Sequence, residues 1–249
     1  ANLGESSYDL NGTNSSALEG YYRTRIGNRS AKWETSITKN IGIDATFFKG
    51  KLDVILDFWQ KDTKDLLFQV PVTATAGYKA SAPSVNVGKM SNKGIDLQII
   101  TRGRFSDDLG YEFNFTAGVL KNNIESLAPG LDYLTSVNPG FRGINPIRNQ
   151  KGYSISSFYG YKVMGLFKDR AEVDSAPDQD GAAPGRFRYE DVNGDGVINT
   201  NDRAYLGSPV PKFTGGVNLR FTFKGFDLET YMYTSIGNKI FNVSKWFTD

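Results

Sequence analysis

Residues 41–59 read Ile-Gly-Ile-Asp-Ala-Thr-Phe-Phe-Lys-Gly-Lys-Leu-Asp-Val-Ile-Leu-Asp-Phe-Trp. Apolar side chains alternate with mostly polar ones over 41–47, and the alternation resumes over 52–59 after the short link Lys49-Gly50-Lys51. A period of two places one row of side chains on each face of a strand, and two such runs joined by a short turn predict a β-hairpin. One face of this hairpin is apolar and the other is largely polar.

The same pattern returns twice along the chain. Residues 95–99 and 111–117 form the second predicted hairpin, and residues 217–223 and 226–232 form the third. Long irregular stretches lie between the hairpins, at about 62–90, 121–155 and 166–212. Short turns therefore alternate with long connections.

Two all-β architectures fit this pattern. In a transmembrane β-barrel, short periplasmic turns alternate with long extracellular loops, the apolar row faces lipid and the polar row faces a water-filled lumen. In a soluble β-sandwich the apolar rows form the core, but structureless connections of this length count against a compact domain. The pattern favours an antiparallel transmembrane β-barrel, with the sandwich as the alternative. Aromatic residues near strand ends would form interfacial girdles in a barrel or core in a sandwich: Phe47, Phe48, Phe58, Trp59, Phe158, Tyr159, Tyr161, Phe221 and Phe223.

The composition excludes several classes of function. The 249 residues include no Cys and no His, which removes disulfides, thiolate metal sites and the commonest general base. A net charge of +2, from 29 basic and 27 acidic residues, gives no argument for nucleic acid as a partner. The sequence has no apolar run long enough for a transmembrane helix and no glycine-rich phosphate-binding motif. We expect no enzymatic activity and no catalytic residues.

One stretch carries a specific metal-binding pattern. Residues 191–202 read Asp-Val-Asn-Gly-Asp-Gly-Val-Ile-Asn-Thr-Asn-Asp, with the oxygen-bearing side chains and the glycine spaced as in an EF-hand calcium loop. The predicted Ca²⁺ ligands are Asp191, Asn193, Asp195, Val197 through its backbone carbonyl, Asn199 and Asp202. Asp202 replaces the usual closing Glu, as in the dockerin variant. Without a flanking helix pair, a structural ion is expected rather than a sensor. The alternative is a cluster of Asx turns.

Several further motifs resemble one known family. They are Lys32-Trp33-Glu34-Thr35, Asn40-Ile41-Gly42-Ile43-Asp44, Phe48-Lys49-Gly50-Lys51-Leu52, Thr63-Lys64-Asp65-Leu66-Leu67, Asn86-Val87-Gly88-Lys89-Met90, Asn92-Lys93-Gly94-Ile95-Asp96, the calcium-loop segment 188–198, and Gly207-Ser208-Pro209-Val210-Pro211-Lys212-Phe213 with Gly215-Gly216. In this order, over about residues 24–249, they resemble the C-terminal barrel half of SusC/RagA-type TonB-dependent outer-membrane transporters.

The resemblance implies a fold and a set of partners. Residues 1–249 would be the C-terminal part of a 22-stranded barrel with an N-terminal plug, carrying the calcium loop within an extracellular loop. The implied activity is import of glycans or peptides across the bacterial outer membrane. The implied partners are a SusD-like lipoprotein lid, TonB, outer-membrane lipid, an oligosaccharide or peptide, and a second transporter–lid pair in a dimer. Because plug, first strands and last strands are not found here, we expect these residues to close a barrel only with further chain.

Two alternatives remain open at this point. The other function that fits the sequence is that of a secreted, calcium-stabilised β-sandwich that binds carbohydrate. The charged residues of the polar rows would either contact substrate or be solvated in a water-filled lumen: Asp44, Asp53, Asp57, Asp96, Glu112 and Arg220. Tyr78, Tyr133 and Phe141, in the long connections, are candidates for stacking on sugar rings or packing on the lid.

Overall fold

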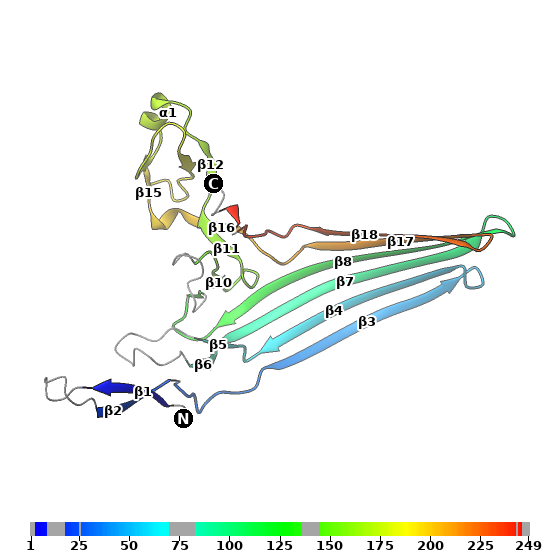
Figure 1. The fold of residues 1–249 in the computed structure, drawn as a ribbon, viewed down its shortest axis with the longest axis horizontal. Coiled ribbons are helices and arrows are strands. Elements are labelled where there is room, and N and C mark those ends of the chain that lie inside the picture. The colour runs from blue at the N-terminus through cyan, green and yellow to red at the C-terminus, as the bar shows by residue number, and fades with distance from the viewer. Residues whose placement is uncertain are drawn as a thin grey trace.

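The computed structural model describes residues 3–8, 18–24, 26–69, 83–135, 145–242 and 244–245. Its main element is one antiparallel sheet of six long strands in the order β18-β17-β8-β7-β4-β3 (Figure 1). The strands are β3 (Thr35–Phe47), β4 (Leu52–Lys64), β7 (Gly88–Arg104), β8 (Leu109–Leu127), β17 (Phe213–Phe223) and β18 (Phe226–Ile236). Each pairs with the next long strand along the chain, so the sheet is a meander that is open at β3 and β18 within the described residues.

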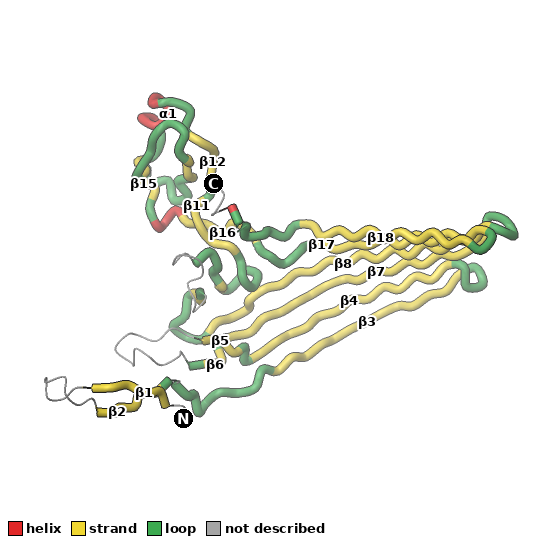
Figure 2. The backbone as a smooth tube through the Cα atoms, in the orientation of Figure 1, coloured by secondary structure: helices red, strands yellow, loops and turns green. Residues whose placement is uncertain are grey.

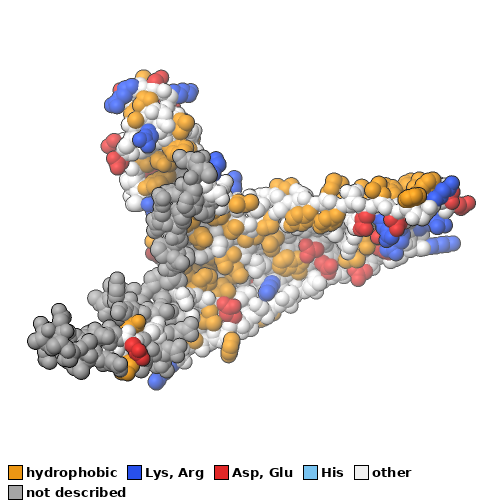
Figure 3. Space-filling model, viewed as in Figure 1, with side chains coloured by type: hydrophobic (Ala, Val, Ile, Leu, Met, Phe, Trp, Pro, Cys, Tyr) orange, Lys and Arg blue, Asp and Glu red, His pale blue; other side chains and the backbone are white. Residues whose placement is uncertain are grey.

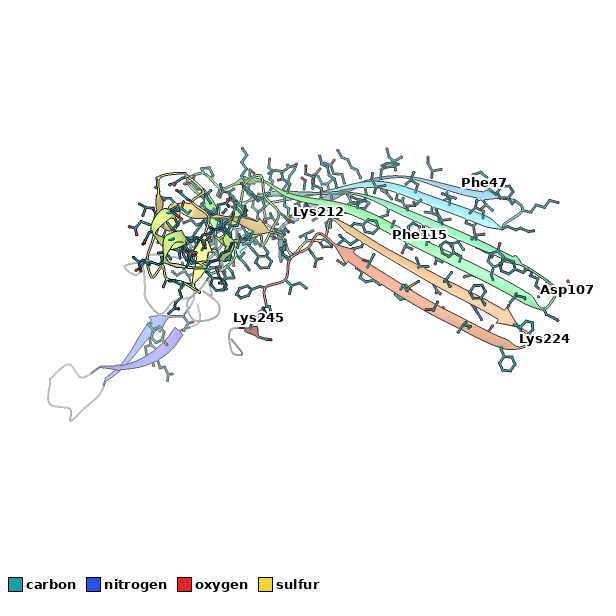
Figure 4. The ribbon with its side chains drawn as sticks, turned by 90° about the horizontal axis from the view of Figure 1, so that it is seen from above. Phe47, Asp107, Phe115, Lys212, Lys224 and Lys245 are labelled. Carbon is teal, nitrogen blue, oxygen red and sulfur yellow. The ribbon has the colours of Figure 1, made fainter. Side chains whose placement is uncertain are left out.

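The structure confirms the three predicted hairpins. Residues 48–51 join β3 to β4, residues 105–108 join β7 to β8, and Lys224 and Gly225 alone join β17 to β18. Lys224 and Gly225 have φ angles of 46° and 86°. Positive φ at both central residues is typical of a type I′ turn, whose twist matches that of the paired strands. All three turns lie at the same end of the sheet, where Figure 4 labels Phe47, Asp107 and Lys224.

The long strands extend further than the sequence pattern predicted. β7 has 17 residues and β8 has 19, so they include residues 88–90 and 121–127, which lie in stretches predicted to be irregular, and β7 also includes residues 91–94, which show no alternation. In these segments polar residues occupy both faces of the strand, and the alternation that indicates a strand is lost. Because a membrane-spanning strand needs only about 9–11 residues, β7 and β8 are long enough to project beyond a membrane.

The remaining elements are short and gather at the end of the sheet opposite the three turns (Figure 2). The antiparallel pairs are β1 (Leu3–Tyr8) with β2 (Leu18–Arg23), β5 (Leu67–Gln69) with β6 (Ser84–Asn86), β9 (Tyr133–Leu134) with β10 (Asn149–Gln150), β11 (Phe158–Tyr161) with β16 (Arg203–Gly207), and β12 (Val163–Leu166) with β14 (Phe187–Tyr189); β13 (Asp178–Gln179) and β15 (Val197–Ile198) are parallel. The same region contains the helix α1 (Arg170–Ser175) and the 3₁₀ helix η3 (Thr200–Asp202). Among the described residues, no helix has the length and apolar character needed to cross a membrane.

Strand register gathers apolar side chains on one face of the six-stranded sheet, which we call the apolar face. Two complete lines across the strands are Ile41, Phe58, Ile95, Val119, Phe213, Ile236 and Ala45, Val54, Ile99, Phe115, Val217, Met232. Many of these side chains are exposed: Ile41 is 75% exposed and Ile236 is 56% exposed.

No second sheet covers the apolar face in the part of the chain that the structure describes. The buried hydrophobic side chains, Leu66, Val87, Ile124, Leu134 and Phe167, lie at or beyond the strand ends that carry the long connections. The sheet therefore has no protein core on its apolar face, and the sandwich alternative is wrong. A contiguous exposed apolar surface of this kind marks contact with a partner or with lipid.

Candidate functional site

The opposite side of the sheet, the polar face, carries the charged residues predicted for it. Asp44, Asp53, Asp57, Asp96, Glu112 and Arg220 all lie on this face by strand register. Near the turns, Arg102 forms an ion pair with Asp53 at 2.5 Å and lies opposite Glu112. Arg220 in turn lies opposite Glu112 and approaches Asp227 at 3.4 Å. Charges of alternating sign thus cross the sheet at its turn end, where Figure 3 also shows Lys, Arg, Asp and Glu side chains together.

Near the middle of the polar face, two carboxylates are cross-strand neighbours. Asp57 is paired in register with Asp96, and the outer neighbours on either side are Gly42 and Gly118. The two carboxylates lie over these glycines, because a Cβ at Gly42 would meet Asp57 Oδ1 and one at Gly118 would meet Asp96 Oδ1. Asp57, Asp96 and Gly118 line a cavity of about 310 Å³ on this face, together with Tyr231 and Tyr233. Asn40 Nδ2 donates to Asp57 Oδ1 at 3.1 Å, and Trp59 Nε1 donates to Asp96 Oδ2 at 2.7 Å.

The predicted aromatic girdle was wrong for four of its residues. Trp59 lies on the polar face, because it alternates with Phe58 on β4, and its indole reaches Asp96. Phe158, Tyr159 and Tyr161 belong to β11, which is outside the six-stranded sheet. The others do lie on the sheet or its turns, and Phe47, Phe48 and Phe223 are exposed at the turn end together with Phe226.

Residues 191–202 form a compact turn held by its own hydrogen bonds. Asp191 accepts from the N–H groups of Gly194 at 2.7 Å and Gly196 at 2.8 Å, and Asn193 Oδ1 accepts from the N–H of Asp195 at 3.0 Å. Gly194 and Gly196 have φ angles of 73° and 84°, a region that favours glycine. These are contacts of the kind that the Asx-turn alternative predicts.

The end of this loop is fixed by a buried carboxylate. Asp202, at the end of η3, is fully buried and accepts from the N–H of Asn199 at 2.7 Å and the N–H of Val192 at 3.0 Å. The hydrogen bond from Asn199 is the largest cause that holds the pKa of Asp202 below its ordinary value. Val197 and Ile198 form β15, which pairs with β13 and ties the loop to a second segment.

The predicted calcium ligands are therefore close in sequence and part of one turn. Asp191, Asn193, Asp195 and Asn199 are joined by short-range side-chain contacts, including Asn193 Nδ2 to Asp195 Oδ2 at 2.8 Å and Asn199 Nδ2 to the carbonyl of Val197 at 3.4 Å. Among the described residues, no three or more acidic side chains converge as a group that could hold a metal. The assignment of calcium to this loop stays a prediction.

Sequence reasoning missed a cationic cluster in the long connection between β8 and β17. The guanidinium of Arg148 lies 3.8 Å from the centroid of the Tyr133 ring and 4.4 Å from that of Tyr159. Tyr205 continues the aromatic cluster, 5.2 Å from Tyr159 and stacked on Tyr153 at 3.5 Å between ring centroids. The sequence makes Tyr133 a candidate for stacking on sugar rings or packing on the lid, but nothing in the sequence indicates Arg148 as its cation partner. Tyr78 and Phe141 lie outside the described residues.

Comparisons with known proteins agree with this fold. A family model described as "TonB dependent receptor-like, beta-barrel" matches residues 4–245. TonB-dependent receptor P26 of Formosa agariphila is 30% identical over 241 residues, which cover 97% of this chain and 24% of the relative. TonB-dependent receptor SusC of Bacteroides thetaiotaomicron is 25% identical over 229 residues, which cover 89% of this chain and 21% of the relative.

Solved structures give the same result for the fold. The structure of the RagAB peptide transporter superimposes with a TM-score of 0.76 at 23% identity, covering 100% of this chain and 25% of that chain. The RagAB peptide importer in its "open-open" state gives a TM-score of 0.73 at 21% identity, again covering 100% of this chain. The chain spans about a quarter of the length of the curated relatives that it matches. The relatives named here are receptors or transporters.

Proposed function

Because the chain belongs to the TonB-dependent receptor-like β-barrel family, we propose that it forms part of the wall of an importer for oligomeric nutrients in the bacterial outer membrane. The apolar face contacts lipid and the polar face lines the lumen. Further strands of the barrel pair with the open edges at β3 and β18, as hydrocarbon requires. The total of 22 strands follows from the resemblance to this family.

One observation carries this proposal. Six strands that are neighbours in one sheet present a continuous, exposed apolar face on one side and charged residues on the other. Neighbouring residues on one strand therefore meet different solvents, as in a barrel wall between lipid and water. Leu56 and Ile55 make a sharp comparison, because both are aliphatic and they point to opposite faces of β4.

These 249 residues contain no Cys, so a single introduced thiol is unique once any Cys elsewhere in the complete gene product is replaced by Ser. We expect Ile55→Cys in the complete gene product, in outer membranes, to react with a water-soluble thiol reagent. Leu56→Cys is expected to react slowly with that reagent and to be quenched by lipid-borne spin labels when it carries a fluorophore. Equal reaction of both thiols with the aqueous reagent would contradict a lipid-facing apolar face.

The short turns and long connections give the wall a direction. We assign the turns at 48–51, 105–108 and 224–225 to the periplasm and the connection at 128–212 to the cell surface, because outer-membrane barrels have this asymmetry. On the surface a SusD-like lipoprotein would act as the lid, and TonB would supply energy from the other side. The RagAB relative is a peptide transporter, which supports peptides as the cargo. Glycans as an alternative cargo, and a dimer of transporter–lid pairs as the assembly, follow from the resemblance to SusC/RagA-type transporters.

Uptake and co-purification test this part of the proposal. Cells that carry the complete gene product are expected to accumulate fluorescent oligopeptides or oligosaccharides. This accumulation is expected to stop when TonB is removed. The protein purified from these membranes is expected to carry a lipoprotein partner. If the barrel is correctly inserted and the cells accumulate neither oligopeptides nor oligosaccharides, the proposed import function is wrong.

We further propose that residues 191–202 bind one structural Ca²⁺. The loop concentrates oxygen ligands from Asp191, Asn193, Asp195, Val197, Asn199 and Asp202 within one turn, and oxygen is the ligand type that Ca²⁺ takes. The test replaces Asp191 and Asp195 by Ala, with the exposed Asp180→Ala as a matched control outside the loop. Ca²⁺ is expected to protect the loop from proteolysis in the parent and control proteins only. Unchanged metal content and protease sensitivity in the double variant would exclude the site.

A further inference from the structure

Arg148 is held in a fixed position beside the end of β8. Its backbone N–H donates to the carbonyl of Ser157 at 2.9 Å, and the N–H of Tyr159 donates to the carbonyl of Pro146 at 2.8 Å. These hydrogen bonds place the guanidinium between the rings of Tyr133 and Tyr159, at 3.8 Å and 4.4 Å from the two centroids. The two rings attract the cation and remove water from it.

This cation has no anionic partner in the part of the chain that the structure describes. None of the ion pairs there includes Arg148. Its Nε atom is buried and has no hydrogen-bond acceptor among the same residues. Removing a charged group from water without pairing it is costly, so the arrangement favours an anion supplied from elsewhere.

The geometry of the stack determines which anion fits. A guanidinium is planar, and stacking on aromatic rings uses its faces. The N–H groups lie along its edges and form a fork that matches the two oxygens of a carboxylate. Aromatic stacking of Arg148 is therefore compatible with carboxylate binding in the plane of the guanidinium.

Arg148 lines a groove that supplies further donors. The groove has a volume of about 640 Å³ and is lined by Ser126, Leu127, Leu131, Asp132, Arg148, Gln150 and Lys151. Lys151 adds a second cation, and Gln150 accepts a hydrogen bond from the hydroxyl of Tyr205 at 2.9 Å, which leaves its amide nitrogen as a donor. Asp132 is exposed and forms no ion pair with either cation in the described structure.

We propose that this groove binds a carboxylate of the imported oligomer, with Arg148 as the bidentate partner and Lys151 as the second cation. The inference rests on the proposed import function and specifies part of its substrate chemistry. The carboxylate comes either from a peptide, as its C-terminus or an acidic side chain, or from a uronic acid in a glycan. Both present the same planar pair of oxygens.

Matched ligand pairs test the proposal on the complete gene product purified in detergent. One pair is an oligopeptide with a free C-terminal carboxylate and the same peptide as its amide; the other is a uronate-containing oligosaccharide and its neutral, carboxyl-reduced form. In at least one pair, the carboxylate form is expected to bind about tenfold or more tightly than the neutral form. The pair that shows the difference identifies the source of the carboxylate.

Variants assign the effect to Arg148. Arg148→Gln is expected to lower the affinity for the carboxylate form to that of the neutral form, and Arg148→Lys, which keeps the charge but loses the fork, to restore it only in part. The matched control is Arg186→Gln, since Arg186 is exposed and lies in a different part of the long connection. If Arg148→Gln does not fold, Lys151→Gln serves the same purpose and is expected to weaken the carboxylate form alone.

The results that would exclude a carboxylate site in the groove differ from those that would contradict the import function. The carboxylate site would be excluded if the protein bound both members of both pairs with equal affinity. It would also be excluded if Arg148→Gln and Arg186→Gln bound the carboxylate form with equal affinity. In that case uptake of neutral oligomers by cells would still support the import function. Loss of all uptake in the parent protein would instead contradict the import function itself.

Discussion

Trp59 on β4 lies across Gly94 on β7, its partner in register, and covers the space that a side chain at Gly94 would occupy. A Cβ atom at position 94 would meet Cε2 and Cζ2 of the Trp59 ring at 2.5 Å. The same ring donates from Nε1 to Asp96 Oδ2 at 2.7 Å. The glycine thus allows an indole to lie flat on the polar face and to contact one of its central carboxylates.

Gly94→Ala is expected to displace the Trp59 ring and to break its hydrogen bond to Asp96. Overpacking of this kind costs about 1–3 kcal/mol. The measurement is the urea midpoint of the protein in detergent, together with tryptophan fluorescence, which should shift to the red as the indole is exposed. Gly27→Ala is the control, because no described residue lies within 4 Å of a Cβ at that position. Matching midpoints and spectra for the two variants would show that the ring does not depend on Gly94.

Leu56→Arg is expected to destabilise the inserted protein by about 2–4 kcal/mol, the cost of a cation near the middle of the lipid-facing band. Ile55→Arg is expected to be nearly neutral, because Ile55 lines the water-accessible cavity on the polar face. Unfolding from lipid vesicles measures both values. Equal destabilisation by the two adjacent substitutions would contradict the assignment of the faces.

Acid is expected to loosen the loop at residues 191–202. The N–H of Asn199 lowers the pKa of Asp202 below the ordinary value of 3.8, so the folded loop favours the carboxylate. The stabilisation is therefore complete above about pH 4 and is lost as the pH falls through the lower pKa of the folded state. Hydrogen exchange of the loop amides at neutral pH and at about pH 3 measures it.

Asp202→Asn is expected to remove this pH dependence and to speed exchange already at neutral pH. The N–H groups of Val192 and Asn199 donate to different oxygens of Asp202, and the amide replaces one of these oxygens with an NH₂ donor. The exposed Asp180→Asn is the control in the same connection and should exchange like the parent. A loop in Asp202→Asn that is as protected as in the parent would refute the role of this carboxylate.

Tyr205 is expected to ionise later than an ordinary tyrosine. Burial raises its pKa from 10.0 to about 12, against the lowering effect of the Arg148 cation. The folded state therefore favours the neutral phenol, and this contribution to stability is complete below about pH 10 and is lost as the pH rises from 10 through 12.

Phenolate absorbance, taken as the difference between the parent protein and Tyr205→Phe, isolates this one group. The difference should appear near pH 12 in the folded protein and near pH 10 in the unfolded one. Arg148→Gln should raise the pKa of Tyr205 in the folded protein further, since it removes the cation that lowers this pKa. If the Tyr205 phenolate appears at the same pH in the folded and the unfolded protein, Tyr205 is solvated in the folded state.

The wall of the barrel could be predicted from the sequence because its information is local and periodic. Ile41, Ile43 and Phe47 mark one face of a strand, and the link at 49–51 marks the turn that fixes pairing with the next strand. The pattern failed where both faces are polar, as in the first residues of β7 and the last residues of β8. There, pairing with the neighbouring strand continues the structure without any alternation in the side chains.

The candidate sites also differ in how much of each could be predicted from the sequence. The loop at 191–202 was found because its residues are contiguous and their spacing is fixed by one turn. Arg148 and its partners Tyr133 and Tyr159 come from separate segments that share no period, and only the folded connection brings them together. The face of Trp59 could be read from alternation with Phe58, whereas its contact with Asp96 requires the glycine on the next strand.

The meander keeps its register independently of the chain between β8 and β17. Val119 meets Phe213 across a connection that runs from residue 128 to residue 212, whereas the turns at 48–51, 105–108 and 224–225 are short. Doubling the length of such a connection adds only about 0.6 kcal/mol of closure entropy. Under the proposed function, exchange of this whole insert, with its groove and its loop, would change what the protein recognises while the six-stranded sheet stays the same.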